Sequence, residues 1–221
     1  MLEKLAKQTA VYGISTIAVR FLSYLLTPVF TRVFEPEAYG IVTDVYALIP
    51  FALVVLTMGL ESAYFRFAAK ADAAAAAAGG TEGEIAARAR AGKRRLFATA
   101  WGVTLLAASL FFLLTAFGRE RVAEWMGEAY VAHPEYVLLV AAVVWFDVAA
   151  CLPFSRLREQ GRAMTFVGIK ALGVVVNVAL AIGFALAGLY GTPFGVGWVF
   201  VANLIASAVT FNVILLTTDR T

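Results

Sequence analysis

Six long apolar runs, joined by shorter polar or charged stretches, set the hydrophobic pattern of this 221-residue chain. At 1.5 Å per residue, each run is long enough to cross about 30 Å of hydrocarbon as a helix. None shows the alternating segments of about ten residues that a membrane barrel needs. The pattern therefore predicts an all-α membrane protein with about six transmembrane helices, at residues 9–33, 39–67, 96–117, 136–154, 163–189 and 194–217.

Composition supports this class. Hydrophobic residues make up 62% of the chain, charged residues only 15%, and the mean hydropathy is +0.82, whereas soluble domains have about 25% charged residues. Because lipid offers no hydrogen-bond partner to the backbone, only helices and closed barrels span a bilayer. The composition excludes a soluble domain, and the long runs favour helices.

Lysine and arginine are concentrated in alternate connections. The N-terminal tail, residues 70–95, residues 156–162 and the C-terminal tail are basic, while the opposite side has only three arginines beside six glutamates. The positive-inside rule therefore predicts that both termini are cytoplasmic. Residues 70–95, a low-complexity stretch with an alanine run at 73–78, are expected to form a flexible basic cytoplasmic loop, in which residues 84–95 are a candidate surface helix because Glu84 and Arg88 are spaced i,i+4. Residues 118–135 are expected to form an external loop. The net charge of +3 reflects this sidedness, so no nucleic-acid partner is expected.

The first apolar run contains a charge at membrane depth. Arg20 lies near its middle, and Thr16, Tyr24 and Thr27 flank it at helical spacing, close to one face. A charge in the bilayer costs at least about 3 kcal/mol, so it faces protein or water, and a ligand or ion site is the default interpretation. The alternative is that Arg20 pairs with a buried acid.

The second and fourth runs also contain residues that are unusual in a membrane. Pro50 is expected to kink the second helix, and Glu61 either pairs with Arg66 or lines a cavity. Asp147 lies midway along the fourth run. It is a candidate partner for Arg20, or a group that responds to protons or cations.

Weaker candidates lie on the last two runs. Lys170 and Asn177 share a face of the fifth run, and Asn203 begins a stripe with Ser207 and Thr210 on the sixth. Lys170 is close enough to the cytoplasmic end to extend its ammonium to the interface. Polar stripes of this kind pack helices together as often as they bind ligands.

No catalytic motif accompanies these residues, so an enzyme is not expected. The chain has one cysteine, Cys151, and one histidine, His133, which is too few for a classical zinc or haem site. No cofactor and no metal are predicted.

Several motifs stand out in the first third of the chain: Tyr12-Gly13, Arg20, the phrase TRVFEPEAYG that ends at Gly40, and GLESAYFRF at residues 59–67. With these motifs, this third resembles bacterial polysaccharide flippases of the MOP exporter superfamily. The remainder resembles this family in hydropathy and topology.

The resemblance implies a two-lobed transporter in the bacterial inner membrane, working by alternating access. Its cationic cavity would hold the pyrophosphate of an undecaprenyl-linked oligosaccharide, with Arg20, Thr16, Tyr24 and Thr27 around it. Glu61, Asp147, Arg66 and Pro50 would balance charge or serve in gating. Family members are about twice as long, so this chain resembles the amino-terminal lobe, and a carboxy-terminal lobe or a second copy is an expected partner, beside membrane lipid.

Two other functions remain open. A drug/cation antiporter of the same superfamily would rely on Asp44, Glu61 and Asp147 rather than on Arg20. A non-transporting scaffold in a polysaccharide-synthesis complex would not depend on the intramembrane charges.

Overall fold

All regular structure in the described part of the protein, residues 26–218 of the computed structural model, is helical. Five segments are long and apolar enough to span a membrane, and they comprise α3 with α4, α5, α8, α9 and α10. The expected all-α membrane protein is confirmed. Of the first expected span, only its end is described, as α2, and residues 1–25 lie outside the described part. The helices are α2 (Thr27–Val33), α3 (Pro36–Thr57), α4 (Leu60–Ala77), α5 (Glu82–Phe117), α6 (Arg119–Met126), α7 (Glu128–Val131), α8 (Pro134–Glu159), α9 (Ala163–Leu186), η1 (Leu189–Gly191) and α10 (Gly197–Thr218).

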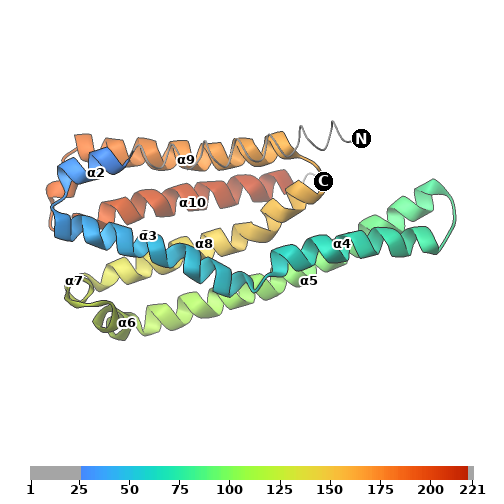
Figure 1. Ribbon diagram of the computed structural model, residues 1–221, viewed down its shortest axis with the longest axis horizontal. Coiled ribbons are helices and arrows are strands. Elements are labelled where there is room, and N and C mark those ends of the chain that lie inside the picture. The colour runs from blue at the N-terminus through green and yellow to red at the C-terminus, as the bar shows by residue number, and fades with distance from the viewer. Residues whose placement is uncertain (1–25, 219–221) are drawn as a thin grey trace.

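Helix α8 is the centre of the bundle. Its most apolar window is 61% buried, whereas those of the other four spans are between 11% and 39% buried. Helices α3, α5, α9 and α10 all pack against it, and Figure 1 shows α10 and α9 stacked on one side of it and α5 on the other. Valines at one-turn spacing fill the contact, with Val144 and Val148 almost fully buried.

The segment 70–95, expected to be a flexible loop, is instead a helical hairpin. Helix α4 continues to Ala77 and α5 begins at Glu82, so only a short turn separates them. Alanine is the best helix former, which explains why the alanine run extends α4. Thr81 and Glu84 form a capping box at the start of α5, and Arg88 Nη1 donates a hydrogen bond to the Gly79 carbonyl, 2.8 Å away.

This hairpin extends beyond the other helices (Figure 1). Helix α5 has 36 residues and is therefore about 54 Å long, well above the thickness of about 30 Å of a hydrocarbon core. Its basic first half lies before the apolar run that begins at Leu96. The hairpin is thus a helical extension of two transmembrane helices.

The second expected span is interrupted between α3 and α4, while the kink expected at Pro50 stays a prediction. The helix continues through Pro50 and ends at Thr57. Met58 and Gly59 follow, both in the left-handed conformation with φ of 49° and 69°. Glycine adopts this conformation readily and often ends helices, which explains why the break lies here. The expected external loop, residues 118–135, also contains the two short helices α6 and α7.

Candidate binding cavity

A cavity of about 680 Å³ lies between α2, α3, α9 and α10, with α8 contributing one residue to its wall. Polar side chains line much of it, although the helices around it are strongly apolar. Six residues predicted from the sequence come together here: Thr27, Pro50, Asp147, Lys170, Asn177 and Asn203. They come from five helices, and only the tertiary structure brings them to one space.

Helical periodicity places the polar groups of α9 and α10 on facing sides. On α9, Lys170, Gly173 and Asn177 are spaced by three and four residues, and all line the cavity. Gly173 lies directly against Thr210 of α10, because a Cβ added at this glycine would overlap the Thr210 Oγ1 atom. The glycine therefore allows the two helices to approach closely beside the cavity.

Asp147 and Lys170 are the charged members of the described cavity wall. The Asp147 carboxyl interacts with the Ser207 hydroxyl of α10, and it attracts the Lys170 ammonium. Lys170 Nζ also lies over the ring of Phe154, 4.2 Å from its centroid, a cation–π contact. Lys170, expected to reach for the interface, thus forms part of the cavity.

Two tyrosines of α3 complete the wall and were missed by the sequence analysis. Tyr39 and Tyr46 lie on the same helical face as Thr43 and Pro50. The Tyr46 hydroxyl interacts with the Asn177 side chain, which joins α3 to α9 in the wall. Their spacing of seven residues was a signal for this face, but tyrosines in a membrane helix are also common at its interfaces.

Glu61 is not among the described residues of the cavity wall. It forms an ion pair with Arg158 of α8. Arg158 Nη2 is also 3.3 Å from Ser155 Oγ, and Cys151 Sγ lies 3.7 Å from Glu61 Oε2. Arg66, the partner considered from the sequence, is exposed on α4. Arg158 was not expected as this partner, because the fourth helix was predicted to end at residue 154, whereas α8 continues to Glu159.

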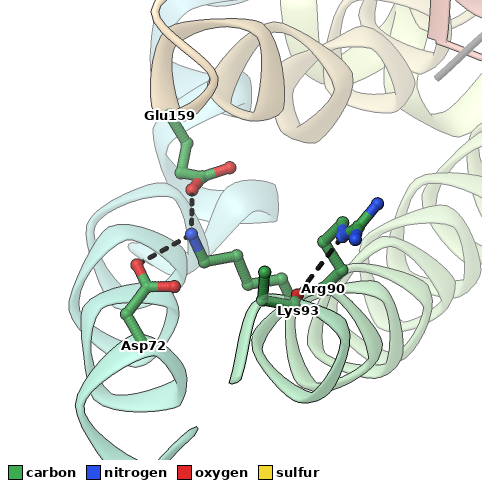
Figure 2. A network of polar contacts seen from close by, with 5 residues as sticks. Asp72, Arg90, Lys93 and Glu159 are labelled. Carbon is green, nitrogen blue, oxygen red and sulfur yellow. Dashed lines mark hydrogen bonds and ion pairs between the residues drawn. The ribbon is translucent and has the colours of Figure 1, made fainter. Parts of the chain in front are cut away.

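A second group of charges joins three helices near the same end of α8. Lys93 Nζ of α5 lies 2.8 Å from Asp72 Oδ2 of α4 and 2.7 Å from Glu159 Oε1 of α8. Figure 2 shows the lysine between the two carboxylates, while Arg90 turns away to the carbonyl of Ala86 in its own helix. These contacts attach the base of the hairpin to the transmembrane bundle.

Arg20, Thr16 and Tyr24 lie outside the described residues, so their assignment to the cavity stays a prediction. Within residues 26–218, histidine, cysteine and acidic side chains do not form a group of three that would hold a metal ion.

The fold and the cavity define a multi-pass, all-α membrane protein with a polar space among its helices. The family described as "Polysaccharide biosynthesis protein" matches residues 5–219, nearly the whole chain. The chain belongs to this family. Comparison with curated proteins and with solved structures gave no match.

Proposed function

We propose that this chain is the amino-terminal lobe of a transporter that moves undecaprenyl-diphosphate-linked oligosaccharides across the bacterial inner membrane by alternating access. Membership of a polysaccharide biosynthesis family and five described spanning segments support a role at the membrane step of glycan assembly. The flippase-like sequence around Arg20 supports the choice of substrate. Both termini would then be cytoplasmic, and a carboxy-terminal lobe or a second copy would complete the cavity.

The polar cavity is the observation that carries this proposal. Charged groups at membrane depth are retained where they serve ligand or ion passage. The volume of about 680 Å³ is within the usual range of ligand pockets. It suits a polar headgroup, while a polyprenyl tail would remain in the surrounding lipid. Lys170 and Asp147 in the wall provide one charge of each sign.

The proposed roles follow from charge. A diphosphate needs cations, and an arginine offers a planar fork that matches phosphate oxygens. Arg20 would bind the pyrophosphate together with Thr16, Tyr24 and Thr27, with Lys170 as a second cation. Asp147 would balance these charges. Glu61 and Arg66 would act in gating or structure, which the ion pair of Glu61 with Arg158 supports.

Binding by the purified protein in nanodiscs tests the proposal. Farnesyl diphosphate, a short polyprenyl diphosphate, is expected to bind at least about tenfold more weakly after Arg20→Ala or Lys170→Met, because each removes a charge-assisted contact. Lys70→Met is the matched control, since Lys70 is an exposed lysine on α4. Unchanged binding by the Arg20→Ala variant would contradict the pyrophosphate site.

A drug/cation antiporter is the second candidate, and Asp147 with two tyrosines in the wall favours it. Carboxylates and aromatic rings are the groups that bind organic cations. Tetraphenylphosphonium binding that is lost in Asp147→Asn and retained in Arg20→Ala would support this function in place of the flippase.

A further inference from the structure

The cation of the described cavity wall, Lys170, is separated from the neutral amide side chains along the cavity. On α9, Asn177 lies two turns from Lys170, which is about 10 Å at 1.5 Å per residue. Helix α10 packs against α9 (Figure 1) and returns antiparallel to it, with Thr210 beside Gly173. Asn203, two turns before Thr210, therefore lies toward the Asn177 end.

Helix α3 adds aromatic rings to the same neutral end. Tyr46 interacts with Asn177, and Tyr39 lies two turns before Tyr46, closer to the start of α3, and is also in the wall. All four side chains are only half-buried, so the cavity reaches them. The neutral end consists of Tyr39, Tyr46, Asn177 and Asn203. Lys170 marks the charged end, and Asp147 lies between the two ends, beside Ser207 and about one turn of α10 from Asn203.

The neutral end has the chemistry that recognises a sugar. An asparagine amide offers two donors and an acceptor oxygen, which match neighbouring hydroxyl groups. A tyrosine provides a flat apolar ring for the C–H face of a pyranose and a hydroxyl at its edge. A phosphate would gain little here, because the described residues of this end carry no cation.

We propose that Tyr39, Tyr46, Asn177 and Asn203 form a glycan subsite, which binds the first sugar of the substrate while its diphosphate occupies the charged end. This inference rests on the proposed function and names the part of the substrate that the neutral end selects. The separation of about 10 Å between Lys170 and Asn177 suits a diphosphate followed by one sugar ring.

The experiment compares two ligands on the full chain in nanodiscs: farnesyl diphosphate, and the same lipid with one N-acetylglucosamine on its diphosphate. Asn177→Ala and Tyr46→Phe are each expected to weaken binding of the glycosylated ligand by about five- to tenfold, which corresponds to the loss of one or two neutral hydrogen bonds. Binding of farnesyl diphosphate is expected to stay within about twofold. Asn212→Ala is the matched control, because Asn212 is exposed on α10 and bonds its own helix.

Equal weakening of both ligands, or of neither, overturns the glycan subsite. Tyr46→Phe retains the ring and the packing, so it decides the question if Asn177→Ala does not fold. Failure of the proposed function looks different, since neither diphosphate then binds to the wild type. In that case, binding of free N-acetylglucosamine is measured. If the wild type binds this sugar and Asn177→Ala does not, the subsite is upheld. If the wild type does not bind the sugar, the subsite is overturned.

Discussion

Lys93 Nζ lies 2.7 Å from Glu159 Oε1, and this contact joins the first half of α5 to the last turn of α8. Asp72 Oδ2 of α4 lies 2.8 Å from the same Lys93 Nζ atom. One lysine thus connects three helices at the base of the hairpin, where Glu159 is only 16% exposed.

Removal of this lysine should destabilise the bundle. Lys93→Met leaves two carboxylates close together without their cation. The expected loss is about 1–2 kcal/mol, between the values for exposed and buried ion pairs. The apparent melting temperature in detergent measures it. Arg94→Met, at the exposed neighbouring position, should have little effect, and equal losses for the two variants would contradict the role of Lys93.

At Gly59, where the helix is interrupted, substitution by a residue that avoids the left-handed region should lower the stability of the protein. At φ of 69°, Gly59→Val is expected to lose at least about 1–2 kcal/mol, whereas Gly59→Asn should lose less, because asparagine tolerates this conformation. No atom lies within 4 Å of an added Cβ, so the difference reports on the backbone. The melting temperatures of both variants measure this difference. Gly40→Ala is the control, because Gly40 lies within α3 and does not have a positive φ. A Val variant as stable as the Asn variant would contradict the prediction.

The close packing of α9 against α10 can be tested by adding a methyl group at Gly173. Gly173→Ala pushes on Thr210 Oγ1 and should lose about 1 kcal/mol. Gly168→Ala on the same helix meets open space and should be neutral or slightly stabilising through helix propensity. Thr210→Ala removes the overlapping atom, so the double variant with Gly173→Ala should recover stability. Absence of recovery would place the strain elsewhere.

The phenol of Tyr130 on α7 should make the folded protein less stable at high pH. Burial, with a smaller effect of the Asp44 carboxylate, raises the pKa of its phenol to about 12, and its hydroxyl lies 3.4 Å from the Ile41 carbonyl that accepts from it. The unfolded chain loses this proton near pH 10, so the contribution is complete below pH 10 and is lost as pH rises toward 12.

Melting temperatures between pH 8 and pH 12 test this contribution. Tyr130→Phe should be close to the wild type at pH 8 and should lose less stability above pH 10. Trp125→Phe is the control, because Trp125 is an exposed aromatic residue on the neighbouring α6. Parallel pH curves for the wild type and Tyr130→Phe would exclude Tyr130 as the titrating group.

The positions of the apolar helices along the chain were predictable, although several of their ends were not, because burial in lipid depends on local composition. Apolar runs of about 20 residues leave the backbone no alternative to a helix, and the starts of α8 and α9 lie within two residues of the expected ones. The polar stripes of α9 and α10 were also predictable, since helical periodicity alone places Lys170 with Asn177 and Asn203 with Ser207.

The hairpin was predictable in principle, although the sequence analysis interpreted it as a loop. Low complexity suggested flexibility, but alanine favours helix, and Thr81 with Glu84 matches a capping box. The break after Thr57 is different. Both Pro50 and Gly59 are helix-breaking residues, but a proline is tolerated inside a membrane helix, whereas Gly59 adopts the left-handed conformation that ends one.

The sequence by itself determined the class of protein, the approximate spans and the helix faces that are polar, because these depend on neighbours along the chain. Only the tertiary structure decided which faces meet. It paired Glu61 with Arg158 rather than Arg66, and it placed Asp147 and Lys170 in one cavity with Tyr46. Such choices depend on the distances between side chains on different helices, and those distances follow from how the helices pack around α8.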